Sequence, residues 1–263
     1  MLSVATLTVF PIKSLDGVTV PSVRLLPSGA IAGDRRFALV DAEGRFVNGK
    51  RTPAIHRLRA EFDGLSPDGQ FSAVTLTGPD GARRRFAGET WSADVVPYLS
   101  DYFDMAVRVI ENAVTGFPDD LDSPGPTLLS TATIAAVAEW FGLSVEETTR
   151  RFRANVVLTA AEPFAEDLLF GTAGAAPIFR IGAVRLIAVN PCQRCVVPTR
   201  DSRTGDVLAG FQKEFARLRQ ASLPEAVARD RFNHFYRLAV NTRPLPEFSG
   251  GEIHTGDAVV AGN

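Results

Sequence analysis

Closely spaced β-strand and turn signals fill about the first 95 residues and limit what this chain can fold into. Stretches such as SVATLTVFPI and RFALVDAEGRFV are rich in β-branched and aromatic residues, which favour strands. The dipeptides Glu43-Gly44, Asp68-Gly69 and Asp80-Gly81 are turn signals between short apolar stretches. Closely spaced hairpins of this kind predict a β-barrel or β-sandwich in this part of the chain.

The remainder of the chain mixes helices and strands. The stretch TWSADVVPYLSDYFDM is expected to form a helix that is interrupted near Pro97. Ser130 or Thr131 can cap a helix that ends at Gly142, and Ser144 begins a second helix with a capping box. Strands are expected at ANVVLTA and AVRLIAV, and an amphipathic helix at VLAGFQKEFARLRQA. Because helices and strands do not alternate regularly, the order predicts an α+β fold.

Composition and charge exclude several classes of protein. Hydrophobic residues make up 45% and charged residues 22% of the 263 residues, values typical of a globular chain. The net charge of −2 argues against binding to nucleic acid or to a membrane surface. The apolar run at the amino terminus is short and has no basic region before it, so we expect a cytoplasmic protein. Two cysteines three positions apart exclude a disulfide-stabilised secreted scaffold.

Both cysteines lie in the stretch NPCQRCVVPTRD. Its prolines predict a loop at a strand end, which disfavours a thioredoxin-like thiol at a helix N-terminus. A zinc site would need two more ligands, and the three histidines are scattered along the chain. Two buried structural cysteines are a further alternative. Arg194 and Arg200 argue against it, because nearby positive charge favours a thiolate that acts as nucleophile or soft-metal ligand.

Basic and polar residues elsewhere could form an anion site. They lie in three groups: Lys13-Ser14, Arg35-Arg36, and Arg151 with Arg153 and Asn155. Alternation along a strand lets only one of Arg35 and Arg36 face a ligand, and Arg36 could instead pair with Asp34. Arg151 and Arg153 are expected to share one face of an extended segment. The acidic, turn-rich stretch 117–126 is either a linker or an active-site loop.

The stretch PCQRCVVPTRDSRTG resembles the signature of MOSC domains, the fold shared by the carboxy-terminal part of molybdenum cofactor sulfurases and by amidoxime-reducing molybdoenzymes. FPIKSLDGV and GDRRFALVDAEGRFV resemble the amino-terminal β-barrel domain that accompanies MOSC domains, and RFRANVVL and GGEIHTGDAVV resemble later family segments. There are two departures. Ala154 stands where relatives have proline, and NGKR replaces a Thr-Ala-Arg-Gln stretch, which leaves the roles of Lys50 and Arg51 in the substrate pocket open.

The resemblance implies an α+β fold in which a β-rich, barrel-like domain packs on a MOSC-type β-barrel domain with peripheral helices. The two domains would comprise residues 1–112 and 113–263. It also implies a bound molybdenum–molybdopterin cofactor (Moco) with Cys195 as the thiolate ligand of the metal. The residues expected to be catalytic are Cys195 and Asp201, and those expected to bind the cofactor are Lys13, Ser14, Arg35, Arg151, Arg153, Asn155 and Thr199. Asp201 could instead form an Asx turn.

The implied activity is that of an oxidoreductase, independent of pyridoxal phosphate, which reduces N-hydroxylated small molecules. A separate reductase, iron–sulfur or haem protein must supply the electrons, because two cysteines cannot hold an iron–sulfur cluster and the chain has no Gly-x-Gly-x-x-Gly element. One alternative is a cofactor carrier or sulfur-transfer module in which Cys195 bears a persulfide and Cys192 resolves it. Another is an interaction domain that has lost its cofactor.

Overall fold

The computed structural model describes residues 2–248 and 250–262. The strands of the amino-terminal half are β1 (Leu2–Val9), β2 (Val18–Val20), β3 (Ser22–Arg24), β4 (Phe37–Val40), β5 (Arg59–Asp63), β6 (Ala73–Thr77), β7 (Arg83–Ala87) and β8 (Arg108–Glu111). The later strands are β9 (Leu128–Ser130), β10 (Val156–Thr159), β11 (Ile178–Ile181), β12 (Val184–Gln193), β13 (Arg237–Pro244), β14 (Glu252–His254) and β15 (Ala258–Ala261). The α-helices of the described residues are α1 (Trp91–Phe103), α2 (Thr131–Phe141), α3 (Val145–Phe152) and α4 (Phe211–Ala221).

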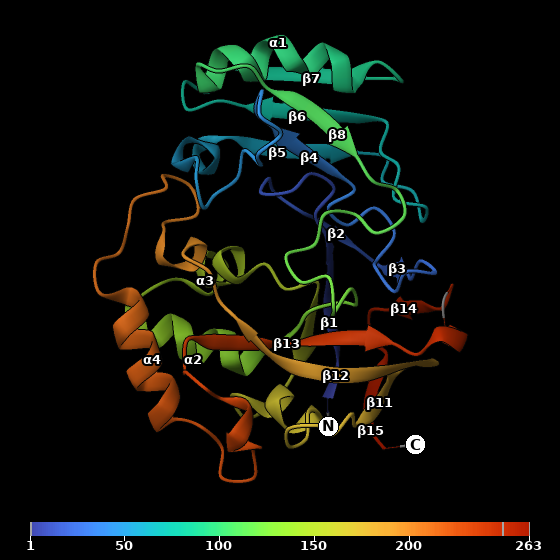
Figure 1. The fold of residues 1–263 in the computed structure, drawn as a ribbon, viewed down its shortest axis with the longest axis vertical. Coiled ribbons are helices and arrows are strands. Elements are labelled where there is room, and N and C mark those ends of the chain that lie inside the picture. The colour runs from blue at the N-terminus through green and yellow to red at the C-terminus, as the bar shows by residue number, and fades with distance from the viewer. Residues whose placement is uncertain (1, 249, 263) are drawn as a thin grey trace.

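A closed β-barrel forms the larger part of the molecule (Figure 1). Its strand order in the described residues is β10-β9-β13-β12-β11-β15-β1, and the ring closes because β1 also pairs with β10. Strand β2 extends β1 at one side. The first strand of the chain is thus held between β15 and β10, both from the carboxy-terminal half. The boundary between residues 112 and 113 stays a prediction, because strand pairing crosses it.

A second, smaller layer lies beyond one end of the barrel (Figure 1). It contains the sheet β5-β6-β7, the pair β4-β8 and helix α1. Its core is aromatic: the rings of Phe37, Phe71 and Trp91 pack on one another at centroid distances of 4.8–5.6 Å. The molecule is therefore α+β and rich in β-structure, as expected from the order of its elements.

The barrel interior is filled by aliphatic residues, and helices cover it outside. Leu7, Leu186 and Val240 are among the residues that are fully buried inside. On the outside, aromatic side chains of α4 pack on those of neighbouring elements, with the rings of Phe211 on α4 and Phe141 on α2 4.1 Å apart. Burial of these large side chains makes the cluster a major contribution to the packing of α4.

The predicted helix caps are confirmed, whereas two other local predictions fail in whole or in part. The side chains of Ser130 and Ser144 accept hydrogen bonds from the third residue after them, as expected of helix caps. Helix α1 is continuous through Pro97, because Val95 and Leu99 on its buried face pack into the aromatic core. The loop expected from Asn190 onward begins only at Arg194, because β12 runs to Gln193; Cys192 thus lies in the strand and Cys195 in the loop. Two irregularities in the pairing of β12 with β13 accommodate a proline.

Candidate cofactor-binding site

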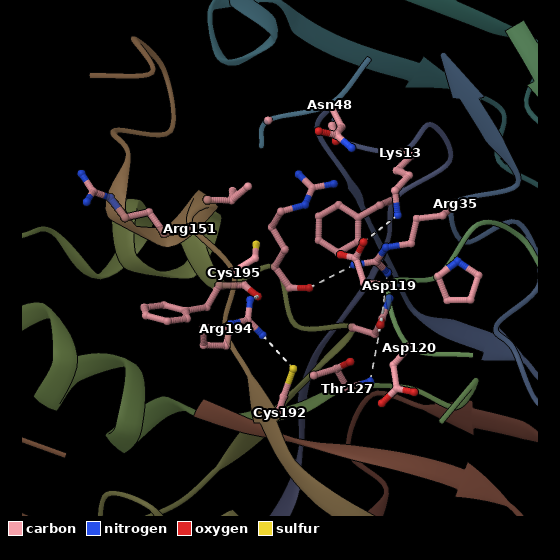
Figure 2. A pocket seen from close by; sticks show the side chains of 18 of the residues that line it. Lys13, Arg35, Asn48, Asp119, Asp120, Thr127, Arg151, Cys192, Arg194 and Cys195 are labelled. Atoms are coloured by element: carbon pink, nitrogen blue, oxygen red, sulfur yellow. Dashed lines mark hydrogen bonds and ion pairs between the residues drawn. The ribbon is translucent and has the colours of Figure 1, made fainter. Parts of the chain in front are cut away.

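A cavity of about 800 Å³ is lined by residues from both halves of the chain, including both cysteines (Figure 2). Its size is within the range of small-molecule and cofactor sites. The acidic stretch 117–126, which the sequence left as a linker or an active-site loop, lies along the cavity through Asp119 and Asp120. Figure 2 shows Cys195 on one side of the cavity and Lys13 and Arg35 on the other.

The cysteine side of the cavity is held by Tyr236, which directly precedes β13, and by an arginine. Cys195 lies just beyond the end of β12 and is half-buried. The hydroxyl of Tyr236 donates a hydrogen bond to the carbonyl oxygen of Cys195 at 3.2 Å. The guanidinium of Arg194 donates to the sulfur of Cys192 at 3.3 Å and to the carbonyl of Phe152 at 2.8 Å. These contacts fix the backbone that presents the Cys195 thiol to the cavity.

Three residues on the opposite side have a left-handed backbone. Ser14, Arg35 and Arg153 have φ values of 71°, 47° and 51°, and all three line the cavity. They are half of the six residues other than glycine with positive φ in the described part of the chain. Such conformations cost about 1–3 kcal/mol each and concentrate at functional sites. This clustering supports the anion site that the sequence predicted at these positions.

Arg35 and Arg153 form a cationic pair around one aromatic ring. Their guanidinium carbons lie 4.8 and 4.1 Å from the centre of the Phe10 ring. Arg35 is paired with Asp34 and also donates to the side-chain oxygen of Asn155 at 3.3 Å. Burial, together with the charge of Arg35, lowers the pKa of Arg153 to about 10, so Arg153 stays charged at neutral pH.

One nitrogen of this pair has no partner. The Nη2 atom of Arg153 is buried and makes no hydrogen bond to any described residue. Buried polar atoms are almost always paired, and charged donors gain most from an anionic acceptor. The residues therefore fit an anionic group of a ligand at this side of the cavity.

Lys13 and Asn155 complete the cationic side. The ammonium of Lys13 donates to the carbonyl of Phe117 and to the carboxylate of Asp119, both at 2.8 Å. Burial, partly offset by Asp119, lowers the pKa of Lys13. The buried amide of Asn155 is anchored by donating to the carbonyl of Thr8 at 3.1 Å, and this anchor positions the oxygen that accepts from Arg35.

Arg151 borders the cavity, but its charge is already paired. It lies in the last turn of α3, so the expected extended segment is wrong: the helix continues to Phe152, and Arg153 caps it in the left-handed conformation. The Arg151 side chain is only 4% exposed and donates to Glu147 at 2.6 Å. It also donates to the carbonyl of Pro198 at 3.3 Å. Arg151 thus ties α3 to the segment that follows Cys195.

Asp201 and Thr199 shape the loop after Cys195 and are not among the residues that line the cavity. The carboxylate of Asp201 accepts from the backbone amides of Arg203 and Thr204 at 2.9 and 2.8 Å, which is the Asx turn left open by the sequence. The hydroxyl of Thr199 donates to the carbonyl of Val196 at 2.7 Å. A catalytic role for Asp201 and a cofactor contact for Thr199 stay predictions.

Sequence reasoning missed His56 and Asp119 as cavity residues and left Lys50 open. The Nε2 atom of His56 lies 3.4 Å from the carbonyl oxygen of Gly49, and burial lowers the pKa of His56. The ammonium nitrogen of Lys50 lies 3.5 Å from a carboxylate oxygen of Asp119, and both residues line the cavity. An isolated histidine carries no local signal, whereas the sequence predicts either a linker or an active-site loop for the acidic stretch around Asp119.

Metal binding by the chain alone finds no support in the described residues. They contain no group of three or more histidine, cysteine, aspartate or glutamate side chains that could hold a metal ion. A metal beside Cys195 would therefore need further ligands from a cofactor. Within the same residues, every helix is too short or too polar to cross a membrane.

Two solved structures are weakly similar to the model. The crystal structure of YiiM from Geobacillus stearothermophilus is 16% identical with a TM-score of 0.31, and the similarity covers 53% of this chain and 54% of that one. A crystal structure titled as a hypothetical protein is 10% identical with a TM-score of 0.42, covering 99% and 67%. Neither similarity is strong enough to support an argument.

Sequence comparisons identify the family. The chain is 25% identical over 276 residues to molybdenum cofactor sulfurase from Drosophila grimshawi, an alignment that covers 94% of this chain and 33% of that protein. The chain thus spans about a third of the length of this curated relative. Residues 1–113 match the MOSC N-terminal beta barrel domain, and residues 127–260 match the MOSC domain. This chain therefore belongs to the MOSC domain family and is similar in sequence to a molybdenum cofactor sulfurase.

Proposed function

We propose that this protein binds the molybdenum cofactor in the cavity and reduces N-hydroxylated compounds with electrons from a separate donor protein. The observation that carries the proposal is the composition of the cavity. It combines an accessible thiol, Cys195, with the cations Lys13, Arg35 and Arg153, one of which has an unpartnered buried nitrogen. A pterin cofactor with a terminal phosphate and a metal needs both kinds of group.

In this proposal the two sides of the cavity have separate roles. Lys13, Arg35 and Arg153 would hold the phosphate, and the amide of Asn155 keeps Arg35 in place. Cys195 would be the thiolate ligand of molybdenum, with its backbone held by Tyr236. When bound, the cofactor supplies the two-electron redox chemistry.

The chain's other residues would position the substrate and deliver protons. Reduction of an N–OH group to N–H consumes two electrons and two protons and releases water. His56 and Lys50 line the same cavity and carry exchangeable protons. A separate donor protein would supply the electrons, because the two cysteines of this chain are too few to ligate an iron–sulfur cluster.

A carrier or sulfur-transfer module is the second candidate, and one observation favours it. Cys192 lines the same cavity as Cys195, and Arg194 donates to its sulfur. In such a module Cys195 would carry a persulfide and Cys192 would resolve it, so both thiols would be required. A metal anchor requires Cys195 alone.

Molybdenum analysis tests the proposal. The wild type and the variants Cys195→Ala and Cys192→Ala are purified from a host that makes the cofactor, and molybdenum per chain is measured. We expect stoichiometric metal in the wild type and in Cys192→Ala, and its loss in Cys195→Ala. The loaded wild type should then reduce an amidoxime with a reduced viologen dye as electron donor. A wild type without molybdenum contradicts the proposal, and metal without amidoxime reduction favours the carrier.

A further inference from the structure

The cationic side of the cavity already contains an anion supplied by the chain itself. Figure 2 shows Asp119 beside Lys13 and Arg35. Its carboxylate accepts from the Lys13 ammonium at 2.8 Å and lies 3.5 Å from that of Lys50. This carboxylate therefore occupies one of the positions at which Lys13 could bind an anionic ligand.

The segment that carries Asp119 is fixed at both ends. At its start, the amide of Phe117 donates to the carbonyl of Arg35 at 2.8 Å. At its end, the amide of Gly125 donates to the carbonyl of Thr242 at 3.0 Å, and a Cβ atom on Gly125 would lie 2.6 Å from that oxygen. These anchors leave residues 118–124 as the part that can move.

The middle of the segment is held mainly by polar contacts. Leu121 is 79% exposed and provides no apolar anchor. Asp119 binds Lys13 and Lys50, while Asp120 accepts from the side-chain amide of Asn241 at 3.0 Å. The Asp119 side chain is 66% exposed, so water can hydrate its carboxylate as it leaves the lysines.

We propose that Asp119 is an internal counter-ion that an anionic ligand displaces, so that anion binding moves residues 118–124 away from Lys13. The inference rests on the proposed function, in which the anion is the phosphate of the cofactor. Lys13 has three donor hydrogens, and two are used by Phe117 and Asp119. A phosphate within hydrogen-bond distance of Lys13 would also be repelled by the carboxylate, so exchange is favoured over shared binding.

Phosphate titration of the cofactor-free 263-residue chain tests this exchange. Affinity for inorganic phosphate is measured by calorimetry at neutral pH for the wild type, Asp119→Asn and Asp122→Asn. Asp122 is an exposed carboxylate on the same segment, so its variant changes the net charge equally without altering the Lys13 contact. We expect Asp119→Asn to bind phosphate at least about two- to fivefold more tightly, because a fully exposed ion pair is worth that factor and the lysine of this pair is buried. Asp122→Asn should match the wild type.

Hydrogen exchange gives a second readout that does not depend on enzyme activity. In the wild type, phosphate should increase amide exchange in residues 118–124, and in Asp119→Asn exchange there should be high without phosphate. Lys13→Gln and Arg153→Ala are included as variants that should lose phosphate binding.

The outcomes separate this inference from the proposed function. One outcome is that the wild type and Asp119→Asn bind phosphate equally tightly, while binding still requires Lys13 or Arg153. This result refutes Asp119 as a counter-ion but does not contradict the proposed cofactor site. A lack of phosphate binding in every variant, Asp119→Asn included, overturns both.

Discussion

Replacing Arg153 separates the conformational cost of the candidate site from its ligand-binding role. Arg153 caps α3 with φ of 51°, and its guanidinium is buried with one unpartnered nitrogen. Glycine adopts this conformation freely, whereas alanine keeps the strain, about 1–2 kcal/mol for an L-residue. Both substitutions remove the contact with the Phe10 ring. The free energy of unfolding should therefore be about 1 kcal/mol higher for Arg153→Gly than for Arg153→Ala.

Asp104 offers a matched control for the backbone effect. It caps α1 with φ of 50°, is exposed, and does not line the cavity. Urea unfolding should show a similar difference between Asp104→Gly and Asp104→Ala, and both should bind inorganic phosphate like the wild type. Both Arg153 variants should lose phosphate binding. Equal stabilities of Arg153→Gly and Arg153→Ala, beside a clear difference at Asp104, would refute stored strain at the site. Unchanged phosphate affinity would refute Arg153 as an anion ligand.

Three further predictions concern the structure around the site. Arg219→Leu should lower the free energy of unfolding by about 3–5 kcal/mol in urea titrations, because it leaves the fully buried Asp167 without its ion-pair partner. On the same helix, Arg217→Ala removes an exposed ion pair and should cost no more than about 1 kcal/mol; equal losses would contradict the burial argument. Burial lowers the pKa of His56 below its ordinary value of 6.5. The neutral imidazole therefore contributes to the free energy of unfolding above pH 6.5, and this contribution is lost as the pH falls through the lowered pKa. Urea midpoints of His56→Gln should fall less than those of the wild type between neutral and mildly acidic pH, and equal slopes would exclude this contribution. Tyr236→Phe removes the hydroxyl that donates to the carbonyl oxygen of Cys195, the proposed metal ligand. The variant should stay folded but lose more molybdenum than the wild type during dialysis. Full retention of molybdenum would show that this hydrogen bond does not position the thiolate.

Features that depend on neighbouring residues could be predicted from the sequence. The caps Ser130 and Ser144 and the terminating Gly142 are confirmed, because a helix end is satisfied by groups within four residues. The rule failed at Pro97, where packing of the helix against a distant aromatic core maintains the helix despite the proline. Local preference decides a helix end, and long-range burial decides whether the helix continues.

The candidate site likewise combines residues that could be predicted from the sequence with contacts that depend on the fold. Cys195, Lys13, Arg35 and Arg153 were singled out from motifs and charge, and all four line the cavity. The sequence could not show that the charge of Arg151 is paired inside α3, because an ion pair depends on which side chains the fold brings together.

By itself, the sequence determined which chemical groups are available: one pair of thiols, several groups of cations, an acidic turn-rich stretch, and motifs that resemble those of MOSC proteins. Only the tertiary structure decided which of them share a cavity. Closure of the barrel pairs β1 with β10, which brings Lys13 just after β1 close to Arg153 just before β10. Strand pairing across about 150 residues follows from the register and burial of the closed sheet, which no local pattern specifies.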